Sequence, residues 1–292
     1  MAASIERRNI FHNWDFTAPV NQRGQIETSG FASFPIDRWM IASGGVAPST
    51  QVVRITPDGL LLTNTATSQL SLEQRIEFPR LYRHKTFTIS VEAVSSTGNG
   101  GSLLTFVDGV HVVDAAVTIP AGLTEKVILK RTFTVGDINT GFSVNLRATT
   151  QSAVLVSRVK LEIGTMSTLH ADPPMDYGRE LAVCQRFQLR PNLSSGQLCF
   201  SRAVSMSAHA ILFAMPTPVT MREPITISQN DFSVWTFNAN SVQETGFTFT
   251  VFGGIGAAIG SAAVIIQAAK TNHGLTDARL NIMPTAILDA NL

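Results

Sequence analysis

The chain has 292 residues, of which 44% are hydrophobic and only 15% are charged, and its formal net charge is +1 at pH 7. So small a charge leaves no basic footprint for a polyanion, which excludes nucleic acid as an expected partner. Its two cysteines, Cys184 and Cys199, form no disulfide framework and no CxxC pair, and they fit a protein folded in a reducing cytosol, with one disulfide left open.

Residues 1 to about 165 follow the pattern of short strands. The N-terminus lacks an apolar run of signal-peptide length, so secretion by that route is not expected. Alternating apolar and β-branched residues predict strands over 86–95, 126–135 and 153–164, and Asp108-Gly109 predicts a hairpin turn. Roughly ten such strands, without a helix long enough to cross between parallel strands, favour an antiparallel sandwich.

One helix is predicted, over residues 175–187, directly after Pro173 and Pro174. Asp176 suits the N-cap position. Three residues at helical spacing form one apolar stripe, namely Leu181, Cys184 and Phe187. Because a stripe on two or three turns cannot stand alone in water, we expect it to dock at the seam between two domains.

Residues 188–292 return to strand patterns, as in 232–238 and 246–252. The only charged residues between positions 203 and 270 are Arg222, Glu223, Asp231, Glu244 and Lys270. Such a shortage suggests outer faces buried against other copies, as in an obligate oligomer. The alternative is a monomer whose surface is made of Ser, Thr, Asn and Gln.

Residues 251–269 carry no charge over a length that could span a membrane. Gly256 and Gly260 stand at GxxxG spacing. The segment also contains Gln267, and neither flank has a basic cluster or an aromatic belt. We therefore favour buried strands broken by glycine, and expect no membrane insertion.

Motifs that carry chemistry are scarce. The sequence has no GxSxG, HExxH or P-loop motif, and its glycine-rich stretch over 253–260 lacks the Lys-Ser/Thr ending. Its six histidines are scattered without metal-ligand spacing. We expect no enzyme activity, no catalytic residue, no metal and no cofactor, although a carboxylate pair from distant positions stays open.

Aromatic residues are the remaining indication of ligand binding, because sugar rings stack on exposed aromatic rings. Trp14 and Trp39 lie among apolar residues and are predicted to be core. Residues 80–85 place Tyr82 among basic side chains on a loop, and Trp235 falls opposite its strand's apolar face. The candidate glycan contacts are therefore Arg80, Tyr82, Arg83, His84 and Trp235. An ordinary solvated turn and an interface position are the alternatives.

Three stretches, 13–24, 34–42 and 156–187, together resemble bacteriophage and prophage virion proteins of the tail-fibre, spike or head-fibre type. In that group a jelly roll like a carbohydrate-binding module starts with an N-x-x-F…NQRG segment and a DRW strand. It ends with a K-L-E-x-G-x-x-x-T strand and a Y-G-x-E-L-x-x-C-Q-R helix. The matching residues at that end are Lys160, Leu161, Glu162, Gly164, Tyr177, Gly178, Glu180, Leu181, Cys184, Gln185 and Arg186.

Downstream, residues 216–228 resemble the group's Met-Arg-x-x-Pro strand pair, and residues 287–292 its Asp-Ala-Glu-Leu ending, with Asn291 in place of Glu. The group's helix often continues into a Tyr-Tyr or Tyr-Phe pair. Here Phe187 and Gln188 follow the helix, so a partner contact through that pair is not expected to carry over.

From pattern and resemblance together we predict an all-β chain in three parts. These are a carbohydrate-binding-module-like antiparallel jelly roll over 1–168, a linker and helix over 169–188, and a C-terminal β-sandwich for oligomerisation or receptor contact over 189–292. The helix is expected to lie at the domain junction or interface through Tyr177, Arg179, Glu180, Leu181, Cys184, Arg186 and Phe187.

The expected function is that of a virion appendage protein, assembled in the host cytoplasm, that attaches as a homo-oligomer, most simply a trimer, to a host surface polysaccharide. Its other partners would be virion proteins. Two alternatives stay open. One is a purely structural virion protein, such as a head decoration, collar or connector fibre, and the other is a polysaccharide depolymerase.

Overall fold

The computed structural model describes residues 8–43 and 50–189 and, in the C-terminal part, 198–206, 210–216, 232–236, 242–244, 247–251, 263–270, 279–282 and 288–289. The chain divides into two compact units, residues 1–180 and 181–292, which are described separately. Within the described residues, no helix is long and apolar enough to cross a membrane.

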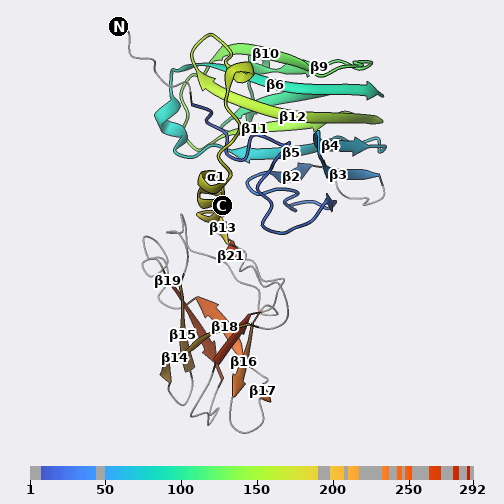
Figure 1. The fold of residues 1–292 in the computed structure, drawn as a ribbon. Coiled ribbons are helices and arrows are strands. Elements are labelled where there is room, and N and C mark those ends of the chain that lie inside the picture. The colour runs from blue at the N-terminus through green and yellow to red at the C-terminus, as the bar shows by residue number, and fades with distance from the viewer. Residues whose placement is uncertain are drawn as a thin grey trace. The chain divides into compact units, whose positions relative to one another are not determined.

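The first unit is a sandwich of two antiparallel sheets (Figure 1). The strands of the first sheet are, in spatial order, β1 (Glu27–Thr28), β3 (Gln51–Thr56), β4 (Gly59–Asn64), β12 (Ser152–Ile163), β6 (Thr86–Thr97) and β10 (Val127–Thr134). Those of the second are β2 (Met40–Ser43), β5 (Leu70–Arg75), β11 (Phe142–Ala148), β7 (Gly101–Val107) and β8 (Val110–His111), with β9 (Val117–Ile119) paired to β7. Three short 3₁₀ turns interrupt the connections: η1 (Pro79–Tyr82) and η2 (Val113–Ala115) lie between strands, and η3 (Leu169–Ala171) lies between β12 and the helix. The predicted all-β class and antiparallel sandwich are confirmed.

The core lies between the two sheets and follows the alternation seen in the sequence. Phe87, Ile89 and Val91 on β6 are fully buried, as their period of two predicts. Trp39 is also fully buried, with the Phe16 ring edge-on at 5.3 Å. Trp14 is partly buried against this core. The core positions predicted for both tryptophans are therefore confirmed.

Two of the segments that carry the sequence resemblance, 13–24 and 34–42, are held together by buried polar contacts, which we call the first lock. Arg23 donates to the Asp37 carboxylate at 3.0 Å, and both side chains are buried. Burial raises the pKa of the Asp37 carboxyl, while Arg23 and Gln22 oppose that rise. The Trp39 indole N–H donates to the Asn13 carbonyl at 3.1 Å. These contacts tie the N-terminal segment to the strand that starts the second sheet.

A second set of buried polar contacts, the second lock, holds the segment that follows β12 against the sheet. Lys160 and Glu162 point away from the core, yet neither is exposed, because residues 165–172 (the strap) pass over them. Lys160 donates to Thr168 Oγ1 at 2.8 Å and to Asp172, and Glu162 accepts from the Thr168 backbone N–H at 2.7 Å. Gly164, at φ 117°, makes the turn between strand and strap.

At the end of the sandwich formed by η1, Asp108 holds a loop in place. Its carboxylate accepts from the backbone N–H groups of Thr140, Gly141 and Asn139 at 2.7–3.1 Å. These bonds hold the pKa of Asp108 well below its usual range. Asp108 and Gly109 have φ values of 50° and 80°, so the predicted two-residue hairpin turn is confirmed between β7 and β8.

The helix α1 (Tyr177–Gln185) begins as predicted, because the Asp176 carboxylate accepts from the Arg179 backbone N–H at 3.1 Å. Its Glu180 accepts from the Asn13 backbone N–H. Glu180 and Glu77 also flank His12, at 3.6 and 3.5 Å from its two ring nitrogens. Burial lowers the pKa of His12, but these two carboxylates outweigh it and the net pKa is raised.

The described strands of the second unit are all antiparallel. Seven of them form one sheet in the order β17 (Val242–Glu244), β16 (Phe232–Thr236), β20 (Arg279–Ile282), β14 (Leu198–Met206), β15 (Ala210–Pro216), β19 (Ala263–Ala269) and β18 (Thr248–Val251). A separate pair joins β13 (Gln188–Leu189) to β21 (Leu288–Asp289). Of the segment weighed as a membrane span, residues 263–269 form a strand between β15 and β18, and 252–262 lie outside the described residues.

Candidate glycan-binding face

The outer face of the second sheet gathers polar and aromatic side chains from four strands. On β11 the inward residues Phe142, Val144, Leu146 and Ala148 are buried, so Ser143, Asn145 and Arg147 point outward. The antiparallel register sets Asn145 between Glu73 on β5 and Leu104 on β7. Phe106 on β7 lies between Ser143 and His111 on β8. We call Glu73, Phe106, His111, Asn145 and Arg147 the outer-sheet site.

Arg147 links the two ends of this site. Its Nη1 donates to Gln69 Oε1 at 3.0 Å, and its guanidinium carbon lies 5.3 Å from the centre of the Phe106 ring. The His111 ring lies 5.5 Å from the same ring, tilted by 39°. Because Phe106 stands four residues from Ser102, the register partner of Arg147, the long arginine side chain must run along the face to reach it. The result is a half-buried platform of one phenyl ring, one imidazole and one guanidinium.

Three polar atoms of the site are buried without a hydrogen-bond partner: His111 Nε2, Asn145 Oδ1 and Arg147 Nε. A buried polar group left unpaired costs on the order of 1–3 kcal/mol, so native proteins keep few of them. Burial also lowers the pKa of Arg147, although a guanidinium remains charged at neutral pH. These three atoms are the polar groups that this face offers to a ligand with hydroxyl or amide groups.

Glu73 adds a carboxylate at the border of the site, 3.6 Å from the Arg75 guanidinium. It is the only carboxylate among the described outward residues of β2, β5, β11, β7 and β8. Across the described part of the chain, no group of three His, Cys, Asp or Glu side chains is placed to hold a metal ion. The chemistry that these residues offer is therefore hydrogen bonding and stacking.

The predicted candidates at residues 80–84 lie elsewhere, on η1 and the turn after it. Arg80 and Arg83 donate to backbone carbonyls of residues 138–139 at 3.2 and 2.8 Å, and His84 lies 3.1 Å from Asp137. The Tyr82 ring packs edge-on against Phe87 and Phe142 at 5.9 and 6.3 Å. Most of these side chains thus have partners within the fold, and their role in glycan binding stays a prediction.

Trp235 and the helix residues also stay predictions. Trp235 is in β16, opposite Arg279 of β20, and its side chain lies outside the described residues. On and after α1, Cys184 and Phe187 are buried, whereas Leu181 and Arg186 are half-buried. Tyr177 and Arg179 are exposed. The Glu180 carboxylate bonds within its own unit, to Asn13 and His12.

Sequence reasoning missed most of the outer-sheet site. It did not single out Phe106, Asn145 or Arg147. The available signal was the alternation in residues 142–148, which places Ser, Asn and Arg on one face of a strand. That signal shows which side chains point outward but not which strand stands beside them.

Comparisons with known proteins give no family. No family model matches the sequence, and no curated protein does. Among solved structures, a family 4 carbohydrate-binding module is 18% identical, with 52% of this chain and 98% of that chain covered and a TM-score of 0.34. The C-terminal family 22 module of Clostridium thermocellum Xyn10B gives 16% identity, 56% and 99% coverage and a TM-score of 0.34.

The enzymatically active domain of tailspike protein 4 of bacteriophage CBA120 is a further match. It is 14% identical, with a TM-score of 0.32, and the alignment covers 53% of this chain but only 21% of that one. TM-scores this low support no conclusion about function. The fold is assigned from the strand order and register of the chain itself.

Proposed function

We propose that this chain is a virion appendage protein whose N-terminal sandwich binds a host surface glycan on the outer-sheet site. The observation that carries the proposal is the set of three buried, unpartnered polar atoms around the Phe106 ring. A sugar fits both features, because the apolar C–H face of a pyranose stacks on an aromatic ring while its hydroxyls donate and accept hydrogen bonds.

Each residue then has a definite part in binding. Phe106 provides the stacking surface, and Arg147 holds the ring from one side while donating through its free Nε. Asn145 accepts from a sugar hydroxyl through Oδ1, and His111 offers Nε2 at the other end. A hydrogen bond to a charged group is worth about 1.5–3 kcal/mol, so a single site of this size gives a weak complex.

Weak single sites suit adhesion by several copies at once. Linking sites in one particle raises avidity far above the affinity of one site. The sequence resemblance to phage appendage proteins and the scarcity of charge between residues 203 and 270 support a homo-oligomer, for which a trimer is the simplest arrangement. Location in the virion, contacts with other virion proteins and attachment to the host are parts of the same proposal.

The test is binding of purified protein to host surface polysaccharide and its oligosaccharide fragments, followed by calorimetry. Phe106→Ala and Arg147→Ala should each weaken binding roughly tenfold or more, the equivalent of about 1.4 kcal/mol. Arg54→Ala is the matched control, because Arg54 is an exposed arginine on β3 of the other sheet, paired with Glu27. It should bind as the unchanged protein does.

Other results would redirect the proposal. Loss of binding in Arg80→Ala but not in Arg147→Ala would move the site to the η1 turn. Unchanged protein that binds neither host cells nor fragments would favour the purely structural role, with the sandwich serving as a wall of the particle.

A further inference from the structure

Strand β10 forms an edge of the first sheet and is the most exposed of the long strands. It pairs with β6 over eight residues, Val127 to Thr134, and no other described strand pairs with it. Only Phe133 is buried, whereas Ile128, Lys130, Arg131, Thr132 and Thr134 are all exposed. An edge of this length presents a row of unpaired backbone groups to which another strand can add.

The hydrogen-bond pattern between β10 and β6 shows which backbone N–H and C=O groups of β10 do not bond to β6. The Val135 N–H donates to the Lys85 carbonyl, so residues 135 and 85 are a hydrogen-bonded pair of the β10–β6 ladder. Such pairs recur at every second residue, at 133, 131, 129 and 127. The N–H and C=O groups of Ile128, Lys130, Thr132 and Thr134 consequently point away from β6, toward the open edge.

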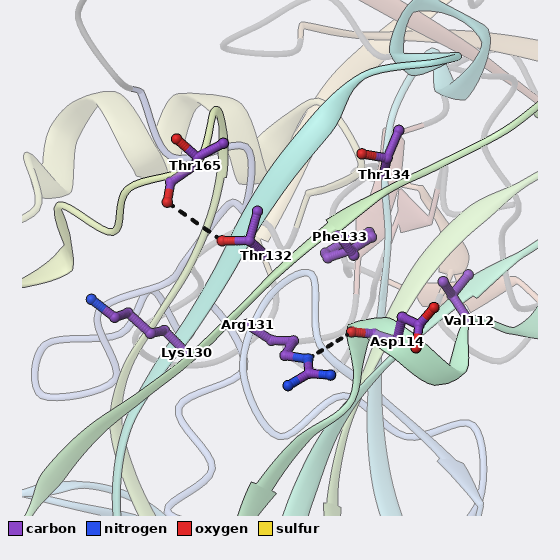
Figure 2. Close-up of a pocket in the computed structure, with 8 residues that line it drawn as sticks. All are labelled: Val112, Asp114, Lys130, Arg131, Thr132, Phe133, Thr134 and Thr165. Carbon is purple, nitrogen blue, oxygen red and sulfur yellow. Dashed lines mark hydrogen bonds between the residues drawn. The ribbon is translucent and has the colours of Figure 1, made fainter.

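A hollow of about 700 Å³ lies along this edge, lined by residues 130–134 together with Thr165, Val112 and Asp114. Figure 2 shows Thr165 on one side of β10 and Val112 and Asp114 on the other. Thr132 Oγ1 donates to the Thr165 carbonyl at 3.4 Å, and Arg131 Nε donates to the Asp114 carbonyl at 3.0 Å. The strap and η2 therefore flank the free edge and leave space for an added strand.

We infer that this edge is a two-fold interface between two copies of the chain, with β10 paired antiparallel to β10 of the second copy. Free backbone groups meet only when even-numbered residues face even-numbered residues. Centring the pair on Lys130 or on Arg131 would set like charges directly opposite each other, which is destabilising. Centring it on Thr132 sets Thr132 against its own copy and Lys130 against Thr134.

The Thr132-centred register also uses the whole stretch that lines the hollow, 130–134, on both copies. It is isologous, so the same patch serves both partners, and it places a favourable Thr–Thr pair at the centre. Two apolar side chains beside the edge, Ile128 at 39% and Met166 at 58% exposure, would lose exposed area. This inference does not rest on the trimer or on the glycan site proposed above.

Cross-linking tests this register directly. In the proposed pair the two Thr132 Cα atoms stand about 5.5 Å apart, within disulfide range. Thr132→Cys should therefore give a disulfide-linked dimer on non-reducing gels after mild oxidation. Thr134→Cys is the matched control, because it lies on the same strand and face but about 13 Å from its own copy at roughly 3.3 Å per residue. It should stay monomeric on the gel, as the unchanged chain should.

Charge variants give a second reading in solution. Thr132→Asp sets two carboxylates opposite each other and should weaken β10 pairing up to roughly fivefold in sedimentation experiments. Thr134→Asp sets its carboxylate opposite Lys130 and should strengthen the pairing. Cross-linking of Thr134→Cys as efficient as that of Thr132→Cys, or of neither variant, would overturn the inference, as would equal weakening by both aspartates.

Discussion

The second lock, the charged cluster that the strap covers, allows a specific prediction about stability. The Lys160 side chain is 1% exposed, that of Glu162 is fully buried and that of Asp172 is 16% exposed. Lys160→Met keeps a side chain of similar length but removes the only cation described between these two carboxylates. It also removes the donor to Thr168 Oγ1. One oxygen of the Asp172 carboxylate is already buried without a hydrogen-bond partner, and Arg158 acts on this carboxylate through its charge alone.

Removal of one member of a buried ion pair costs about 3–5 kcal/mol, because the remaining charge is left buried and uncompensated. In a unit of this size, each kcal/mol lowers the melting temperature by about 2–4 °C, so we expect a fall of about 6–20 °C. Glu162 keeps the two donors of Thr168 and is affected less than Asp172. A double variant, Lys160→Met with Asp172→Asn, should therefore recover part of the loss.

Thermal melting followed by circular dichroism, with chemical denaturation as a check, measures this effect in the full chain. Lys85→Met is the matched control, because Lys85 is an exposed lysine of the same unit and should change stability by less than about 0.5 kcal/mol. If Lys160→Met melts within about 2 °C of the Lys85→Met control, the strap is not held by this charge cluster and the reasoning fails.

Three further predictions concern turns and pH. Gly59→Ala should lower the free energy of unfolding in urea by clearly more than Gly109→Ala does. A Cβ at Gly59 would lie 2.1 Å from a β12 carbonyl oxygen, whereas Gly109 faces open space. At Gly109 an alanine would bear only about 1–2 kcal/mol of left-handed strain. His12, whose folded pKa is raised, contributes stability that is fully present below its unfolded pKa of about 6.5 and is lost as pH rises through the folded value. His12→Gln should therefore flatten the fall in stability that begins above about pH 6.5. Asp108, whose pKa is depressed, contributes stability above about pH 4 that is lost as the solution is acidified, so Asp108→Asn should remove that acid dependence.

Local features of the fold could be predicted because each depends on a few neighbouring residues. The alternation in β6 identified its buried face, the Asp108-Gly109 pair identified a hairpin, and Asp176 identified the start of α1. Burial of Lys160 could not be predicted in this way. A lysine on the outward side of a strand is normally solvated, and only the path of the strap over β12 buries it.

The outer-sheet site could be predicted from the sequence even less than the burial of Lys160. Glu73, Phe106, His111 and Asn145 come from four separate strands, and only the order β5–β11–β7–β8 sets them side by side. Strand order and register are non-local, since the residues that pair can stand far apart in the chain, as Asn145 and Glu73 do at 72 positions. Among the aromatic residues, the sequence favoured Tyr82 as a glycan contact, but its ring packs against the core phenylalanines.

The locks and the outer-sheet site lie in different segments, which affects where the sequence of such a chain can vary. The segments that carry the sequence resemblance supply the locks: Arg23 with Asp37, Lys160 with Thr168, and Glu180 with Asn13. All five residues of the outer-sheet site lie outside those segments. Substitutions at the locks leave buried charges or donors unpaired and threaten the fold, whereas substitutions on the open sheet face alter mainly what can bind there. A sandwich built in this way can keep its frame while its ligand changes, so a shared frame alone does not identify the sugar.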